Sequence, residues 1–161
     1  MNAQTAGRFA VWAVLAAGLA VVGGQDAAAQ GKKSDAVVKV TATAGKPDAE
    51  GNQVVTVTLD IEKGWHTYAN PVGPEDLATA QTRVKIDGKN RPQVVKIDYP
   101  KGREEKDKVV GNYFVYEGKV DIKATVKRAR GDNGPLDVTV SFQACNDRTC
   151  LQPATVKKTV P

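Results

Sequence analysis

The chain has 161 residues, a formal net charge of +5 and 25% charged residues, with lysines and acids interleaved along it. Nucleic-acid binders more often concentrate their bases on one face or helix, so this pattern disfavours a nucleic-acid partner. With a single histidine and no phosphate-binding loop, the sequence also argues against a serine hydrolase or a nucleotide-binding enzyme.

Residues 1–29 are typical of a secretory signal peptide. Arg8 precedes an apolar run from Phe9 to Val22, and the small residues Ala27–Ala29 follow. The run is shorter than the roughly 20 apolar residues that a membrane-spanning helix needs. We expect cleavage after Ala29, which leaves one exported or periplasmic domain, residues 30–161, with no membrane span of its own.

Alternation of apolar and polar residues predicts about eight strands in the exported part. The predicted strands are 38–44, 55–61, 64–68, 83–87, 93–98, 120–126, 136–144 and 155–160. Turn signals recur between them, and no stretch has convincing helical periodicity. The sequence therefore predicts an all-β fold, an antiparallel immunoglobulin-like β-sandwich.

The sequence also predicts the structure of three stretches outside these strands. Residues 31–35 are predicted to be a mobile polar lead-in. Residues 87–92, with Gly88 and Pro92, predict a hairpin between the strands on either side. Residues 101–108 are so highly charged that they predict a loop outside the core.

The only cysteines, Cys145 and Cys150, follow the best-defined strand. Because side chains alternate along a strand, Cys145 faces away from the core if Phe142 and Ala144 face it. Four intervening residues let the chain fold back and bring the two Cα atoms to a disulfide distance of roughly 4.4–6.8 Å. An oxidising compartment favours that bond.

The cysteine pair leaves alternatives open. A structural disulfide closing a loop of about six residues stabilises a protein by only about 2 kcal/mol, against about 4.7 for a hundred-residue loop. Adjacent thiols suit reversible thiol–disulfide exchange equally well. A soft-metal site of both cysteines with His66 is a third alternative, although a lone histidine on a strand is more often packed or exposed. We predict no metal and no other cofactor.

Three stretches resemble the N-terminal periplasmic domain of the membrane thiol–disulfide reductase DsbD. They are 57–68, with G-W-H-T-Y at 64–68; 95–120, with Gly111 and Y-E-G at 116–118; and 136–161, with F-Q-A-C at 142–145 and C-L-Q-P at 150–153. The last stretch is the most specific. Together the three span nearly all of residues 30–161 in the family's order.

The resemblance implies that Cys145 and Cys150 are a redox pair, with Cys150 forming the mixed disulfide. In the family this pair passes electrons between thioredoxin-like proteins and oxidised exported proteins. The resemblance also implies a shielding cap loop at about 107–113 and an aromatic residue beside the pair. The residues implied are Asp107, Val109, Val110 and Tyr113 in the cap, and Tyr68 beside the site.

This sequence departs from the family pattern in several ways. Val109 stands where the cap has a shielding aromatic, and the loop between the cysteines is one residue shorter than in the best-known members. Family members continue into a membrane electron-transfer domain and a thioredoxin domain. We therefore expect a separate thioredoxin-like protein or membrane reductase as electron donor, or else a non-catalytic exported binding module with a structural disulfide.

Overall fold

The structure is a computed structural model that describes residues 31–161. The predicted signal peptide lies outside the described residues. The described part contains eleven strands and two short 3-10 helices. In chain order these are η1 (Ser34–Ala36), β1 (Val38–Ala44), β2 (Asn52–Ile61), β3 (His66–Tyr68), η2 (Glu75–Leu77), β4 (Arg83–Gly88), β5 (Gln93–Asp98), β6 (Arg103–Asp107), β7 (Gly111–Tyr116), β8 (Lys119–Lys127), β9 (Leu136–Phe142), β10 (Ala144–Cys145) and β11 (Ala154–Val160).

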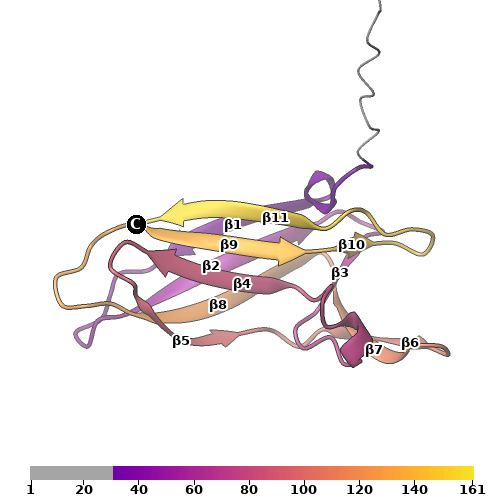
Figure 1. The fold of residues 1–161 in the computed structure, drawn as a ribbon, viewed down its shortest axis with the longest axis horizontal. Helices are drawn as coiled ribbons and strands as arrows, with labels where there is room; N and C mark the ends of the chain where they lie inside the picture. The colour runs from indigo at the N-terminus through magenta and orange to yellow at the C-terminus, as the bar shows by residue number, and fades with distance from the viewer. Residues whose placement is uncertain (1–30) are drawn as a thin grey trace, which may run out of the picture. The chain divides into compact units, whose positions relative to one another are not determined.

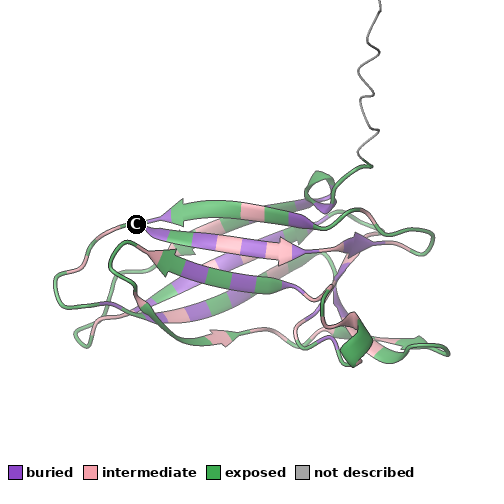
Figure 2. Ribbon diagram, in the orientation of Figure 1, coloured by how far each residue is buried: buried purple, intermediate pink, exposed green. Residues whose placement is uncertain are grey.

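Two sheets face each other and enclose the core (Figure 1). One has the strand order β1-β2-β8-β5 and the other β11-β9-β4, and all pairings between these strands are antiparallel. The side chains that alternate inward from both sheets form one cluster, which includes Val57 and Leu59 of β2 with Val138 and Val140 of β9. Figure 2 shows this alternation along β9. The predicted antiparallel β-sandwich is confirmed.

A third, smaller sheet has the order β10-β3-β7-β6 and lies at one end of the sandwich (Figure 1). The chain enters it directly from the core sheet. Phe142, the last residue of β9, pairs with Ala154 of β11, but Ala144 pairs with Thr67 of β3. The predicted strand 136–144 is therefore two strands in two sheets. This switch carries the cysteine segment out of the sandwich.

The predicted hairpin between residues 83 and 98 is wrong. β4 pairs with β9, whereas β5 pairs with β8 in the opposite sheet. Val84 and Ile86 of β4 are buried, while β5 is a largely exposed edge strand with a bulge between Val94 and Lys96. The turn residues reverse the chain, but burial of the β4 side chains places the two strands in different layers.

The charged stretch 101–108 is a strand over most of its length, not the predicted loop. β6 pairs with β7 from Arg103 opposite Val115 to Asp107 opposite Gly111. Its side chains are largely exposed, as Figure 2 shows, so its position outside the core is as predicted. Charge excludes a segment from the core, but it does not prevent an edge strand from pairing.

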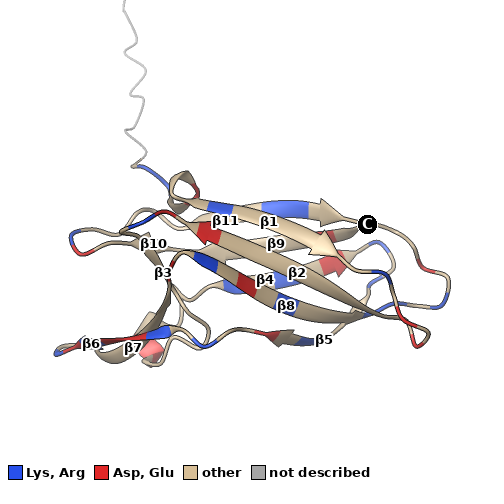
Figure 3. Cartoon of the chain, turned by 180° about the vertical axis from the view of Figure 1, so that it is seen from behind, with Lys and Arg blue, Asp and Glu red and all other residues tan. Residues whose placement is uncertain are grey.

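Charged residues of both signs are distributed over the visible elements (Figure 3), in agreement with their interleaving in the sequence. The β6–β7 hairpin, for example, carries bases and acids side by side. Within residues 31–161, no helix has the length and apolar character to cross a membrane.

Candidate functional site

Cys145 and Cys150 form a disulfide with an Sγ–Sγ distance of 2.03 Å. The two residues face each other as an antiparallel bridge. Backbone hydrogen bonds flank the bridge on both sides, from Asn146 N to Thr149 O (2.9 Å) and from Leu151 N to Ala144 O (2.8 Å). Residues placed in this way form a non-hydrogen-bonded pair, the kind of pair in an antiparallel ladder whose Cα atoms lie closer together. The Cα–Cα distance is consequently 4.0 Å, shorter than the range predicted from the sequence.

The two cysteines differ in their exposure to solvent. Cys145 is only 3% exposed, whereas Cys150 is exposed. Ala144 and Phe142 belong to the core cluster and Cys145 does not, which agrees with the predicted alternation. Cys145 is nevertheless covered on its own side of the small sheet. A partner that approaches from solvent therefore meets Cys150 first.

The Tyr68 hydroxyl lies 3.8 Å from Cys145 Sγ. A disulfide sulfur carries no proton, so the hydroxyl is the donor in this long contact. The backbone carbonyl of Tyr68 accepts hydrogen bonds from Thr82 N (2.9 Å) and Thr82 Oγ1 (2.7 Å), which position the tyrosine. Burial raises the pKa of Tyr68, so the phenol stays protonated near neutral pH.

The loop between the cysteines is organised by its own hydrogen bonds. Asn146 Oδ1 accepts from the backbone N–H groups of Arg148 and Thr149, both at 2.9 Å. This is the Asx-turn geometry that asparagine favours. Gln143 Nε2 donates to the carbonyl of Leu151 at 3.1 Å. None of these bonds involves sulfur, so the turn between the cysteines has hydrogen bonds of its own in addition to the S–S bond.

Ser34 ties the N-terminal segment to both flanks of the cysteine loop. Its hydroxyl donates to the carbonyl of Gln152 at 2.7 Å and accepts from the N–H of Ala144 at 2.8 Å. Ser34 is 0% exposed, so the expectation of a mobile lead-in at 31–35 is wrong at this residue. Sequence reasoning missed Ser34 because its partners lie 110 and 118 positions away.

The predicted cap corresponds to the turn of the β6–β7 hairpin and the start of β7. Asp107 Oδ1 accepts from Val109 N (2.7 Å) and Val110 N (2.9 Å), and these bonds lower the pKa of Asp107. The Tyr113 ring lies 5.9 Å from the Tyr68 ring, centroid to centroid. Val109 is 92% exposed at the turn. The structure therefore brings Tyr113 and Tyr68 together, while a shielding role for Val109 stays a prediction.

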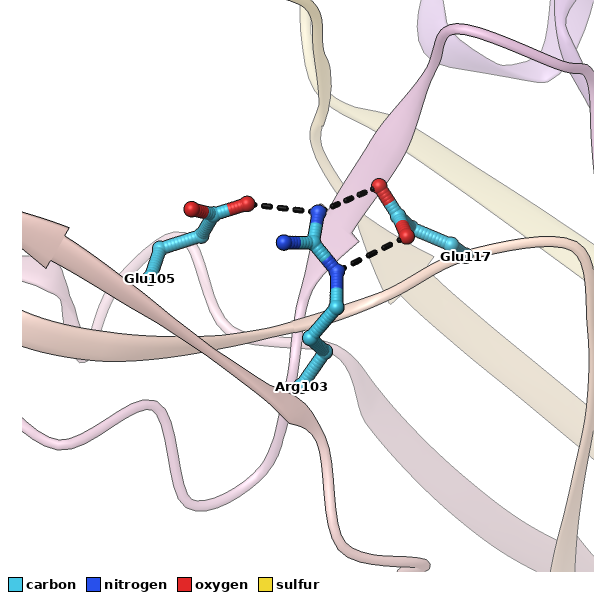
Figure 4. Close-up of polar contacts among 3 residues, drawn as sticks. All are labelled: Arg103, Glu105 and Glu117. Carbon is cyan, nitrogen blue, oxygen red and sulfur yellow. Dashed lines mark hydrogen bonds and ion pairs between the residues drawn. The ribbon is translucent and has the colours of Figure 1, made fainter.

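Charged residues of the same small sheet form a cluster beside the site. Arg103 donates to both carboxylate oxygens of Glu117, at 2.9 and 2.6 Å, and also pairs with Glu105 (Figure 4). The hydrogen bonds from Arg103 lower the pKa of Glu117. A bidentate guanidinium–carboxylate pair of this kind fixes orientation as well as charge. The pair with Arg103 therefore keeps Glu117 ionised and fixes the orientation of its carboxylate.

His66 belongs to β3 and pairs with Cys145 of β10. Burial lowers the pKa of His66, and the nearby carboxylates of Glu105 and Glu117 act in the opposite direction. Within residues 31–161, no group of three or more histidine, cysteine or acidic side chains is arranged to hold a metal ion. Both cysteine sulfurs are committed to the disulfide, so the metal alternative gains no support.

Fold and site together define an antiparallel sandwich domain that presents one cysteine of a short-loop disulfide at its surface. Over residues 33–161 the sequence matches the family described as thiol:disulfide interchange protein DsbD, N-terminal. The chain belongs to this family.

Solved structures similar to this chain include two that contain the DsbD N-terminal domain of Neisseria meningitidis. The domain in its reduced form is 18% identical, with a TM-score of 0.51, and the match covers 78% of this chain and 85% of that one. The complex of that domain with the PilB N-terminal domain gives 18% identity, a TM-score of 0.49, and coverage of 73% and 80%. The first likeness shows the immunoglobulin-like fold predicted from the sequence. No curated protein matches the chain in sequence.

Proposed function

We propose that residues 30–161 form a periplasmic thiol–disulfide exchange domain in which Cys145 and Cys150 relay electrons. The observation that carries the proposal is the unequal exposure of the two cysteines, with Cys145 buried and Cys150 exposed. A disulfide exchanges when a thiolate attacks one of its sulfurs along an open path. In this domain Cys150 provides that path, and Cys145 is the internal thiol that resolves the intermediate.

The exchange proceeds in two balanced steps. A partner thiolate attacks Cys150 Sγ, a partner–Cys150 disulfide forms, and the electron pair of the broken bond goes to Cys145 Sγ. The second thiol of the partner then attacks the mixed disulfide as a thiolate and releases Cys150. The domain is left as a dithiol and the partner as a disulfide. The domain then reduces an oxidised exported protein by the same steps in reverse.

The loop geometry favours reversible exchange over a purely structural disulfide. The Asn146 turn and the flanking backbone bonds keep the two cysteines opposite each other without help from the S–S bond. Such preorganisation lets the disulfide reform without the loss of loop-closure entropy that a flexible loop incurs. The bond therefore adds little to the stability of a domain that already has a large core.

Membership of the DsbD N-terminal family supports the partners that we propose. The electron donor is a thioredoxin-like redox protein or a membrane reductase, and the acceptors are disulfides of exported proteins. The β6–β7 hairpin turn, with Asp107, Val109 and Val110, acts as a cap over the site together with Tyr113 and Tyr68. What supports this cap is the contact of Tyr113 with Tyr68, whose hydroxyl reaches Cys145 Sγ.

Trapping of the mixed disulfide tests the proposal. Cys145→Ser leaves the exposed Cys150 thiol without its resolving partner. We expect its thiolate to displace thionitrobenzoate from a single-cysteine thioredoxin activated as that mixed disulfide, and to form a stable thioredoxin–Cys150 disulfide. Cys150→Ser, the matched control, keeps only the buried thiol and should trap much less. Non-reducing electrophoresis and mass spectrometry of the adduct measure both. Equal trapping by the two variants, or none by either, would overturn the relay and favour a binding module with a structural disulfide.

A further inference from the structure

Attack on Cys150 generates a negative charge on Cys145, which is buried. When Cys150 is attacked, Cys145 leaves with a negative charge while only 3% exposed. A thiolate removed from water is destabilised unless a positive charge or a hydrogen-bond donor lies nearby. The Tyr68 hydroxyl is 3.8 Å away, a long contact that supplies one weak donor. A second donor or a positive charge on the same face of the small sheet as Cys145 would stabilise its thiolate further.

His66 occupies the position in which such a group is required. It is the cross-strand partner of Cys145 in the β3–β10 ladder. Residues directly opposite each other in an antiparallel pair project to the same face, with Cβ atoms about 4.5–5.5 Å apart. The other pair of this short ladder, Thr67 with Ala144, is fully buried on the core side. His66 and Cys145 consequently share the opposite side, with the Tyr68 ring 6.3 Å from the imidazole.

Carboxylates surround His66 from the neighbouring elements. β3 pairs with β7 through Thr67 opposite Tyr116, and one further step in that register places Glu117 opposite His66. Burial has the largest effect and lowers the pKa of His66, and Arg103 acts in the same direction. Glu105 of β6 and Asp147 of the cysteine loop, like Glu117, favour the protonated imidazole. Arg103 is itself paired with both Glu105 and Glu117 (Figure 4). His66 therefore lies between Cys145 on one neighbouring strand and the Glu117–Arg103 ion pair on the other side.

We propose that protonated His66 stabilises the departing Cys145 thiolate and gives it a proton, so that the rate of attack on Cys150 per attacking thiolate rises as the solution becomes mildly acidic. This inference rests on the proposed exchange function and assigns a further residue to it. In the forward step the attacking thiolate bonds to Cys150 Sγ, Cys145 Sγ takes the electron pair, and the imidazolium becomes neutral imidazole. In reverse, neutral His66 takes the Cys145 proton and the resulting thiolate attacks the mixed disulfide.

The test is the pH profile of disulfide reduction by dithiothreitol, with the rate constant normalised to the concentration of reductant thiolate. Above the pKa of a general acid, its protonated fraction and its contribution fall about tenfold per pH unit. We expect the normalised rate of the natural chain to fall as the pH rises from 5 to 8, until it levels off at the rate of the variant that lacks the imidazole. His66→Gln should be at least about tenfold slower at pH 5 and flat with pH, which is a loss that a general acid explains.

Two further variants separate His66 from its neighbours. Tyr68→Phe removes the hydroxyl contact but should keep the pH dependence, since a phenol with a raised pKa does not titrate in this range. Glu117→Gln should shift the midpoint of the profile to lower pH, because it removes a carboxylate that favours protonated His66. The chain has a single histidine, so one imidazole NMR titration in each folded variant reports the same midpoint.

Identical normalised profiles for the natural chain and His66→Gln would overturn the inference, as would loss of the pH dependence in Tyr68→Phe instead. A midpoint unmoved in Glu117→Gln would also count against it. Dithiothreitol reduces structural and exchanging disulfides alike. The profile therefore judges His66 even if thioredoxin fails to exchange, and that failure would contradict the relay alone.

Discussion

The facing sheets of the sandwich and the small sheet at its end are built in different ways. β2 and β8 pair over nine consecutive positions, and apart from Gln53 their buried residues are Val, Ile, Leu and Ala with almost no exposure. β3 pairs over only two positions with β10 and two with β7. The small sheet depends instead on hydrogen bonds from distant segments, through Ser34 and Thr82. The large apolar core lies in the first region and the disulfide in the second.

The separation of the two regions has a physical advantage. A disulfide that opens and closes must change its local contacts, and a long apolar core does not tolerate such change without cost. Short ladders held by individual hydrogen bonds adjust at lower cost. The chain passes between the two regions several times, and the shortest connection is the one residue Gln143 between β9 and β10. Variants in each region should therefore have separable effects.

The largest expected effect comes from the core. Leu59→Ala removes a fully buried side chain and should lower the free energy of unfolding by about 2–5 kcal/mol. The reduction potential of the disulfide in the folded protein should stay unchanged. Chemical denaturation and thiol trapping measure the two quantities. A large change in potential in this variant would show that core and site are coupled.

A smaller effect is expected at the junction of the regions. Ser34→Ala leaves the buried N–H of Ala144 without a partner and should cost about 1–3 kcal/mol. The carbonyl of Gln152 keeps its bond from the backbone N–H of residue 34 at 2.9 Å. Ser141→Ala is the matched control, since its hydroxyl bonds an exposed threonine, and it should change stability by no more than about 0.5 kcal/mol. Equal losses in both variants would contradict this role for Ser34.

The smallest effect is expected from the surface charges. Arg103 holds the pKa of Glu117 below its ordinary value of 4.5 in the folded protein, so the carboxylate contributes stability above that pH. This contribution is lost as the pH falls through the lowered pKa. Glu117→Gln should therefore melt at a slightly lower temperature than the natural chain at pH 7 and at the same temperature near pH 2. Salt should reduce the difference, because the pair is exposed. A difference independent of pH would exclude this cause.

The sequence predicted the sandwich region better than the small sheet. Val38, Val40, Val138 and Val140 alternate with polar residues, and burial on one face is enough to produce that pattern. β6 was missed because its residues are charged on both faces and only its pairing with β7 makes it a strand. The hairpin prediction at 87–92 was wrong because a local turn signal does not reveal which sheet receives the next strand.

The candidate site was predictable only in part. The spacing of Cys145 and Cys150 predicted that they lie close together, and the family resemblance predicted Tyr68 beside them. The burial of Cys145 and the anchoring by Ser34 were not predictable, because both depend on residues far away in the chain. The position of His66 opposite Cys145 likewise depends on the register between β3 and β10, which the sequence does not encode in any local pattern.

The reduction potential of the Cys145–Cys150 pair tests the central claim most directly. The protein would be equilibrated with glutathione and with thioredoxin at defined ratios, and its thiols trapped by alkylation. The account predicts a potential among those of exchange proteins, between about −120 and −270 mV, with ready exchange with thioredoxin. A potential below about −300 mV, the range of structural disulfides, would contradict it.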